Sequence, residues 1–264
     1  MSVVVIEPEV ITSSRHAILD SFDNMPFCDI VPLSEVNELG SYELIVPIDA
    51  ETTKSIASQN DCNYVAYIDD TDGELDQEVL TNAESVLVDG VVIKNHLKSS
   101  FDYDVLTHVV YPPVDMSNCG AAVSPSGVVS VVRDDNSVTL PSDIEVVDID
   151  DLSLVDKLSN TKVSIFPERS SKFVPEIVLS LACGTPCIVL NEGVSMELIG
   201  KSYLIDDTTR TDRGIVVPDV GLIEETIGSV DQSQFSAQFL QNVAKPFNPQ
   251  RYEHQVRHIL RGHI

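Results

Sequence analysis

Short runs of Val, Ile and Leu alternate with longer mixed segments along the whole chain. In the first half these runs predict β-strands over residues 3–6, 43–47, 64–68, 85–88 and 108–111. Between them, apolar positions recur at helical spacing, which predicts helices over residues 15–22, 51–59, 74–82 and 91–98. Continuous apolar runs are typical of strands covered on both faces, and the alternation of strand and helix favours a parallel sheet.

A second series of the same kind follows a break at Pro112 and Pro113, which end a strand and are followed by small polar residues. It predicts strands over residues 128–133, 145–147, 163–166, 187–190, 203–205 and 214–217, and helices over 152–158, 175–183, 195–199, 222–229, 233–243 and 249–260. We therefore predict an α/β protein with two doubly wound, Rossmann-like domains that face each other across a cleft. Their predicted bounds are residues 1–115 and 120–246, and a terminal helix occupies residues 247–264. Ligands of such sheets bind at the carboxyl ends of the strands.

The charge of the chain limits its partners. It carries 42 Asp and Glu against 16 Lys and Arg, a formal net charge of -26. This excludes a generic nucleic-acid binder, since phosphate backbones are recognised through Lys and Arg. Disorder is excluded as well, because disordered chains are poor in apolar residues and 43% of this chain is hydrophobic. The acidity indicates either an acidic interaction surface or a surface adapted to high salt. Carboxylates spread along the whole chain favour the second, a halophilic protein.

The five cysteines, at positions 28, 62, 119, 183 and 187, form no CxxC pair. We expect free thiols that act as small buried hydrophobes, and no metal site. No apolar stretch approaches the roughly 18 residues that a membrane-spanning helix needs, so we expect a cytoplasmic protein.

The most informative stretch is residues 166–199, which has the order strand, loop, helix, tight turn, strand, loop and helix. Pro175 suits the first position of a helix, where its missing N–H costs nothing, and Gly184 suits the left-handed residue that ends the helix. The free N–H groups and positive dipole end at the start of this helix would stabilise a phosphate or diphosphate in the cleft.

The sequence Ala-Cys-Gly-Thr-Pro at residues 182–186, followed by an apolar strand, Asn191 and Glu-Leu-Ile at residues 197–199, carries a resemblance. It resembles the carboxy-terminal nucleotide-sugar domain of GT-B fold glycosyltransferases, specifically the large retaining family 4. The similarity runs from about Val109 to the end of the chain, and before Val86 only the order of elements matches. The resemblance implies a compact transferase that uses a nucleotide-sugar donor and no cofactor.

The family carries two acidic residues with seven residues between them, and Glu168 and Glu176 have this spacing. Their register differs, because counting back from Cys183 places Leu179 and Ser171 at the family's two positions. Either the loop is rearranged so that both carboxylates approach the donor, as catalytic residues, or the spacing is accidental. In the second case Glu176 is an acidic residue of a first helical turn and Glu168 a solvated loop charge.

Cations matter at such a site because the leaving nucleoside diphosphate is anionic. The resemblance implies an Arg and a Lys in this role. Arg133 matches the Arg by its position after an apolar strand, but acidic and amide residues occupy the expected place of the Lys. Arg169 and Lys172 are the nearest substitutes, unless they are merely surface residues. The resemblance also assigns Pro175 and Glu197 to donor binding.

The two ends of the chain bear on the acceptor. The family's glycine-rich loop after the first strand is missing, since no glycine occurs before Gly40. The terminal helix reverses the sign of the chain, with Arg and His residues at positions 251, 254, 257, 258, 261 and 263 against the single Glu253. The resemblance implies that this helix packs back on the first domain, where it would pair with acidic groups. Alternatively, it docks at the inner face of an anionic membrane that carries a lipid-linked acceptor.

Three hypotheses follow. In the first, the protein is a retaining hexosyltransferase that moves a sugar from a nucleotide-sugar to a glycan, lipid or protein-linked acceptor. In the second, it is a non-catalytic binding or structural protein of the same fold with a degenerate donor site, which the displaced carboxylates and the missing glycine loop would explain. In the third, it is a sugar-nucleotide epimerase of the same architecture.

Overall fold

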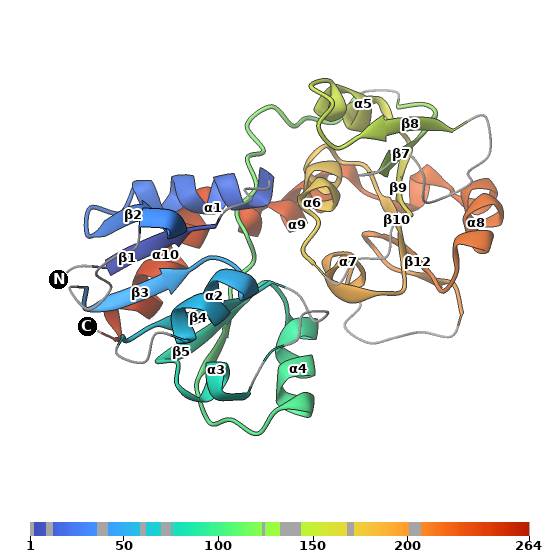
Figure 1. Ribbon diagram of the computed structural model, residues 1–264. Helices are drawn as coiled ribbons and strands as arrows, with labels where there is room; N and C mark the ends of the chain where they lie inside the picture. Colours follow the sequence, from blue (N-terminus) through green and yellow to red (C-terminus); the bar gives the residue numbers. More distant parts are fainter. Residues whose placement is uncertain are drawn as a thin grey trace. The chain divides into compact units, whose positions relative to one another are not determined.

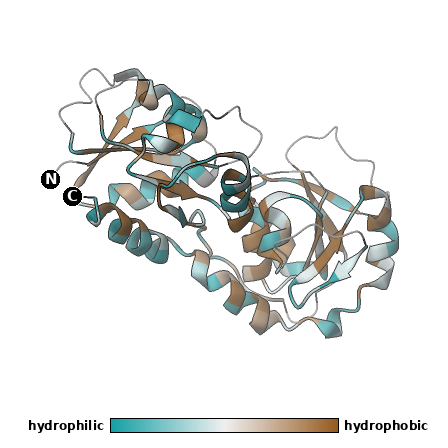
Figure 2. Cartoon of the chain, turned by 90° about the horizontal axis from the view of Figure 1, so that it is seen from below, coloured by the Kyte–Doolittle hydropathy of each residue, from teal (hydrophilic) through white to brown (hydrophobic). Residues whose placement is uncertain are grey.

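The computed structural model describes residues 3–8, 13–35, 42–58, 62–69, 75, 77–122, 125–132, 144–167, 172–200 and 207–263. The chain divides into two compact units. Unit 1 consists of Met1–Pro113, Ser171–Phe173 and Pro249–Ile264, and unit 2 of Val114–Ser170 and Val174–Asn248. Each unit is an α/β layer structure built on a parallel sheet (Figure 1). In both, the strands are mostly hydrophobic and the helices mixed (Figure 2), as expected for sheets covered on both faces.

The described residues of unit 1 form six parallel strands, in the two hydrogen-bonded groups β2-β1-β3 and β4-β5-β6. A parallel bridge between Ile45 and Tyr64 joins β3 to β4, so the strands follow one another in the order β2-β1-β3-β4-β5-β6. The strands are β1 Val3–Glu7, β2 Cys28–Pro32, β3 Leu44–Pro47, β4 Val65–Ile68, β5 Ser85–Val88 and β6 Thr107–Val109.

The helices of unit 1 are α1 Ser13–Asp23, α2 Ala50–Ala57, α3 Gln77–Thr81, α4 Val91–Ser100 and α10 Pro249–Arg261, with a short 3-10 turn at Leu33–Glu35. Although α10 ends the chain, it packs against α1 and adds Tyr252, Val256 and Leu260 to the core. The rings of Phe22 and Tyr252 meet edge to face, with centroids 6.3 Å apart. Burial of such side chains stabilises a fold by about 1.5–3 kcal/mol each, so α10 is an integral part of unit 1.

Strand β2 is missing from the strands predicted from the sequence. Its residues are half-buried or exposed, because β2 lies at an edge of the sheet and pairs only with β1. An edge strand with Pro32 at its end has neither the continuous apolar run nor the alternation that marks a buried strand. The apolar pattern on which the strand predictions depend therefore does not reveal β2.

Where unit 2 is described, it forms a six-stranded sheet in the order β11-β12-β10-β9-β7-β8, and the pairing of β11 with β12 is the antiparallel one. The strands are β7 Val128–Val132, β8 Glu145–Asp148, β9 Val163–Phe166, β10 Cys187–Leu190, β11 Thr209–Arg210 and β12 Gly214–Val217. The helices are α5 Leu154–Asn160, α6 Pro175–Ala182, α7 Gly193–Leu198, α8 Ile223–Ser229 and α9 Ala237–Ala244, with 3-10 turns at Val220–Leu222, Gln232–Gln234 and Lys245–Phe247. The predicted strand over 203–205 lies outside the described residues.

Each sheet has a point at which the strand order reverses. In unit 1 the chain moves from β1 to β2 on one side and then to β3 on the other, and in unit 2 it moves in the same way from β7 to β8 and then to β9. Helices that follow neighbouring strands at such a point leave in opposite directions, which opens space at the carboxyl ends of the strands. These two strand edges are where a ligand of either unit is expected.

Gly184 ends α6 as the sequence predicts. Its φ is +78°, in the left-handed region. The amide of Gly184 donates to the Leu181 carbonyl at 2.9 Å, and that of Thr185 donates to the Ser180 carbonyl at 3.0 Å. This pair of bonds is the Schellman ending, which satisfies the last carbonyls of the helix. A Cβ at residue 184 would lie 2.9 Å from the Cβ of Ala237 and 3.0 Å from that of Ala121, so the position needs glycine for space as well as for φ.

We expect Gly184→Ala to lower the free energy of unfolding of unit 2 by about 1–3 kcal/mol, through strain and overpacking. Gly228→Ala is the matched control, because Gly228 lies in α8 and a Cβ there meets nothing within 4 Å. Alanine in a helix should raise the free energy of unfolding by about 0.5–1 kcal/mol relative to glycine. Urea denaturation of both variants gives the comparison. Equal effects of the two substitutions would contradict the role assigned to Gly184.

Candidate functional site

The donor side predicted from the sequence belongs to unit 2. Strand β9 ends at Phe166, and α6 begins at Pro175 after an extended Val174, so Pro175 is the first helical residue as predicted. Seven of the eight residues of α6 are buried. This helix is therefore fixed in the core, and the direction of its amino end is set by packing rather than by the loop before it.

The predicted donor residues divide into two groups. Arg133, Glu168 and Arg169 lie outside the described residues, so their roles stay predictions. Val132 and Phe166, the last residues of β7 and β9, end neighbouring strands at the point where the strand order of unit 2 reverses. The residues that follow these two strands in the sequence are Arg133 and the loop that contains Glu168 and Arg169.

Three further predicted residues are described. Glu176 lies in the first turn of α6 and is only 4% exposed, so it is not the solvent-facing acid that a first turn usually carries. Glu197 lies in α7 and is half-buried. Lys172 is exposed and belongs with unit 1 although it precedes α6 in sequence. The E-x7-E pairing of Glu168 with Glu176 remains a prediction.

A polar cluster at the carboxyl ends of the unit 1 strands was not found from the sequence. Its core is three aspartates, here called the strand-end carboxylates: Asp49 after β3, Asp69 after β4 and Asp89 after β5. They are 5%, 7% and 5% exposed. A buried carboxylate is costly unless it is paired, hydrogen-bonded or protonated, so each needs a specific partner.

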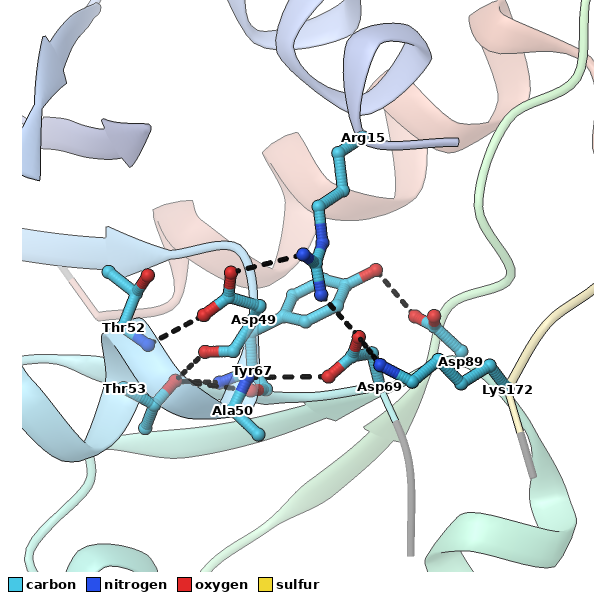
Figure 3. Close-up of polar contacts among 9 residues, drawn as sticks. All are labelled: Arg15, Asp49, Ala50, Thr52, Thr53, Tyr67, Asp69, Asp89 and Lys172. Atoms are coloured by element: carbon cyan, nitrogen blue, oxygen red, sulfur yellow. Dashed lines mark hydrogen bonds and ion pairs between the residues drawn. The ribbon is translucent and has the colours of Figure 1, made fainter. Parts of the chain in front are cut away.

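Arg15 of α1 supplies the first partner (Figure 3). Its guanidinium lies 2.5 Å from an Asp69 oxygen and 3.3 Å from an Asp49 oxygen, and 14% of its side chain is exposed. Asp49 also accepts the Thr52 amide at 2.6 Å, which caps α2. Arg15 therefore holds two strand ends together through charge-assisted bonds.

Lys172 is the second cation of the cluster. Its ammonium lies 3.6 Å from the same Asp69 oxygen that Arg15 contacts, and 45% of its side chain is exposed. The other oxygen of Asp69 accepts the Ala50 amide at 3.3 Å. Lys172 is thus the more solvent-exposed of the two cations that contact Asp69 (Figure 3).

Asp89 is neutralised differently, by a hydrogen bond of 2.5 Å between the Tyr67 hydroxyl and its carboxyl group. Burial raises the pKa of Asp89 well above its usual value, and the nearby Asp69 carboxylate raises it further. Burial and the Asp89 charge likewise raise the pKa of Tyr67. Both causes favour the protonated form of Asp89, while the Asp49 and Asp69 carboxylates face the Arg15 and Lys172 cations.

The sequence carried a signal for this cluster. Asp49, Asp69 and Asp89 are spaced 20 residues apart, and each follows an apolar run that predicts a strand. Parallel strands bring such residues to one edge of a sheet. Arg15 carried no comparable signal, because it enters the cluster only through the packing of α1.

Two other features lie outside the strand edges discussed above. In unit 2 a cavity of about 480 Å³ is lined by residues of the amino ends of β7 and β8 and of α5, including Gly127, Glu145 and Lys157. Lys157 is already paired there with Glu145 and Asp151, each at 3.0 Å.

Among the described residues no group of three or more His, Cys, Asp and Glu side chains is arranged to hold a metal ion. The described helices include none that is long and apolar enough to cross a membrane.

Comparison with known proteins bears on the fold. No protein-family model matches the chain, and no curated protein matches it in sequence. Solved structures do match over the full length. HepE of Anabaena in complex with UDP matches with a TM-score of 0.75 at 10% identity, covering 99% of this chain and 100% of that chain. Sucrose-phosphate synthase from Thermosynechococcus elongatus matches with a TM-score of 0.72 at 13% identity, covering 99% and 98%.

The lipopolysaccharide outer core galactosyltransferase WaaB, in its apo form, matches with a TM-score of 0.72 at 12% identity, with complete coverage of both chains. These proteins are GT-B glycosyltransferases. The chain has the GT-B fold. This confirms the predicted α/β class with parallel sheets. At 8–13% identity among the neighbours, the likeness concerns the fold and not the chemistry.

The charge balance of the cluster gives a matched pair of variants. Asp69→Asn removes the carboxylate that Arg15 and Lys172 share, and should cost about 1–3 kcal/mol of unfolding free energy. Asp89→Asn should cost nothing at neutral pH, because its folded pKa is raised. The unfolded carboxyl ionises at its ordinary pKa, so wild-type stability falls as pH rises from that value toward the raised one.

In Asp89→Asn the fall of stability with rising pH that is due to Asp89 is removed, and the Tyr67 hydroxyl can still donate to the amide oxygen. Urea denaturation of the wild type and both variants between pH 4 and pH 8 measures the difference. A loss of stability in Asp89→Asn that grows with pH would show that Asp89 is ionised in the folded protein.

Proposed function

We propose that this chain is a glycosyltransferase that moves a sugar from a nucleotide-sugar donor to a glycan, lipid or protein-linked acceptor. The observation that supports this most directly is the full-length match to HepE, whose structures hold UDP in one case and UDP-glucose in another. Both units are covered by that match. A nucleoside diphosphate sugar, with UDP-glucose as the first candidate, is therefore the proposed donor.

On the donor side, the amino end of α6 is proposed to face the diphosphate. Its first residue is Pro175, which has no N–H, and the next amides of the first turn are free of intrahelical partners and can donate to an anion. Arg133, Arg169 and Lys172 are proposed to neutralise the charge of the leaving nucleotide. Such a role needs no cofactor, since positioned cations stabilise developing charge by themselves.

The acidic residues complete the donor side of the proposal. Glu168 and Glu176 are the proposed catalytic pair, and Glu197 is proposed to bind the sugar or ribose. The burial of Glu176 supports a functional role over a solvated one, because a 4% exposed carboxylate contributes little to solubility. Retention of the anomeric configuration is part of the proposal and is read from the product by NMR.

On the acceptor side, Asp69 is the proposed hydrogen-bond acceptor for a substrate hydroxyl. It lies at the carboxyl end of β4, and its position is held by Arg15 and by the Ala50 amide. Carboxylates fixed in this way can orient a hydroxyl group for transfer without large motion. The missing glycine loop is compatible with this, because the strand-end carboxylates provide polar groups at the same edge of the sheet.

Titration calorimetry in multimolar salt tests donor binding. We expect wild-type protein to bind UDP-glucose, and Lys172→Ala to raise the Kd about tenfold, equivalent to about 1.4 kcal/mol. Lys98→Ala is the control, because Lys98 is an exposed lysine of α4 outside the cluster, and it should leave the Kd unchanged.

The outcomes separate the hypotheses. No binding of any UDP-, GDP- or dTDP-sugar would reject the transferase. Binding without donor hydrolysis or transfer would favour the non-catalytic protein, and an altered sugar nucleotide without an acceptor would favour the epimerase. If turnover occurs and Glu176→Ala leaves it unchanged, only the assignment of Glu176 is lost.

The terminal helix supports a further part of the proposal, peripheral contact with an anionic membrane. Arg251, His254, His258 and Arg261 are exposed on α10, at a spacing that places them on one face. Tyr252, Val256 and Leu260 form the opposite, buried face. A basic stripe on a protein of charge -26 would be attracted to anionic lipid at about 1 kcal/mol per cation.

Vesicle flotation tests this contact. Wild-type protein should float with vesicles that contain phosphatidylglycerol, should not float with neutral phosphatidylcholine, and should dissociate on addition of salt. Arg261→Glu should weaken flotation severalfold. Lys98→Glu makes the same charge change on α4 and should have a much smaller effect. Equal loss in both variants would mean that net charge, and not the α10 stripe, sets the attraction.

A further inference from the structure

The cavity of unit 2 lies at the amino ends of β7 and β8, which is the opposite end of these strands from the proposed donor site (Figure 1). Val128 and Glu145, the first residues of the two strands, line it together with residues of α5. Its volume of about 480 Å³ falls within the range of roughly 300–1,000 Å³ that small-molecule sites have. Ligands of parallel sheets bind at the carboxyl ends of the strands, so the fold by itself gives no reason for a cavity at this end.

Backbone hydrogen bonds fix the wall of the cavity. The Ser126 amide donates to the Asn160 carbonyl at 2.7 Å, and the Lys162 amide donates to the Gly127 carbonyl at 3.3 Å. These two bonds tie the segment before β7 to the end of α5. Gly127 makes the turn into β7 with a φ of +79°, and a Cβ there would meet nothing within 4 Å. A cavity bounded by a fixed backbone is preorganised, so a ligand loses little of its binding energy to ordering the protein.

A lysine and its acidic neighbours form the charged part of the lining. The Lys157 ammonium lies 3.0 Å from an oxygen of Glu145 and 3.0 Å from an oxygen of Asp151. Among the described residues these contacts occupy two of its three N–H donors, and the third can serve a ligand. Glu145 and Asp156 line the cavity as exposed residues whose carboxylates can accept hydrogen bonds. Three carboxylates against one ammonium make the surroundings negative, so an anion such as phosphate would be repelled.

Neutral groups form the rest of the lining. Ser126, Ser153 and Asn160 bring two hydroxyls and a primary amide, which can both donate and accept. Val128 and Val129 of β7 supply the apolar part. A purely apolar ligand would displace water from the polar groups without replacing its hydrogen bonds. The ligand that matches this lining is therefore a molecule that donates and accepts at several points and has C–H surface between them.

We propose that this cavity is a binding site for a neutral pyranose sugar. Hydroxyl groups of the ring donate to the carboxylates of Asp156 and Glu145 and accept from the Lys157 ammonium. C–H groups of the ring contact Val128. The surrounding carboxylates disfavour the diphosphate of a nucleotide-sugar, so the ligand is the sugar itself and not the donor. The site does not depend on the proposed sugar transfer, because none of these residues is assigned to that reaction.

Amide NMR spectra of the isotope-labelled full-length protein test the site. The protein is titrated separately with glucose, galactose, mannose and N-acetylglucosamine. For at least one of these sugars we expect saturable shifts at the amides of Gly127, Lys157 and Asn160, with a Kd in the millimolar range that is usual for a single small ring. Absence of shifts at these amides with all four sugars would overturn the proposal. Shifts confined to the residues that follow Val132 and Phe166 would also overturn it, and would support only the proposed donor site.

A pair of variants tests the role of the lining. Asp156→Ala removes an acceptor in the first turn of α5 and should raise the Kd for the sugar about tenfold. Glu224→Ala is the matched control, because it removes an exposed acid from the first turn of α8, outside the cavity, and should leave the Kd unchanged. An unchanged Kd in Asp156→Ala, or an equal rise in Glu224→Ala, would contradict the assignment. Both residues are exposed, so neither variant should prevent folding.

An ammonium ligand is the alternative that a negative cavity raises, and putrescine is the probe for it. We expect putrescine to bind at these amides more weakly than the sugar, because the Lys157 ammonium repels a second cation. In Asp156→Asn the amide oxygen still accepts a hydrogen bond, so the sugar should keep most of its affinity although one negative charge is lost. Tighter binding of putrescine than of any of the four sugars, with its loss in Asp156→Asn, would overturn the assignment of a neutral ligand.

Discussion

Parallel strand pairing is the constraint on which the rest of the molecule depends. Every described strand pairing except that of β11 with β12 is parallel. Parallel strands need crossover helices, so each sheet is covered on both faces and its strands are apolar throughout. All carboxyl ends then fall on one edge of each sheet. Polar residues that are 20 positions apart in sequence, such as Asp49, Asp69 and Asp89, meet there for this reason alone.

Three buried carboxylates at one edge of the sheet are electrostatically unfavourable, and neighbouring groups in the cluster offset this cost. A buried carboxylate must find a cation, a donor or a proton. Arg15 serves Asp49 and Asp69, Lys172 serves Asp69, and Asp89 is held with Tyr67 in a state that favours protonation. In a chain with only 16 Lys and Arg, two of them committed to one buried cluster indicate that charge is placed there specifically.

The Ala-Cys-Gly-Thr-Pro segment shows how a sequence motif translates into packing. Gly184 supplies the left-handed residue that ends α6, and the Thr185 hydroxyl donates to the Leu158 and Thr161 carbonyls at 2.7 and 3.2 Å. The Cys183 sulfur accepts the Ser159 hydroxyl at 3.3 Å, and its thiol donates to the Val155 carbonyl at 3.7 Å. The cysteines were expected to be simple buried hydrophobes, and this holds for Cys187. For Cys119 and Cys183 the environment is polar and specific.

The sequence by itself determined the α/β class, most strands, the ends of α6 and the excess of negative charge. These follow from local rules: apolar runs, helix-ending glycines and composition. The edge strand β2 was not predicted, because a half-exposed strand lacks a continuous apolar run. Only the tertiary structure decided that Arg15 joins Asp49 and Asp69, that Lys172 contacts Asp69 of unit 1, and that the Cys119 thiol reaches the Leu179 carbonyl of α6. Those contacts join residues 34 to 103 positions apart in the chain. Local patterns cannot specify them, because each depends on how whole helices and strands pack.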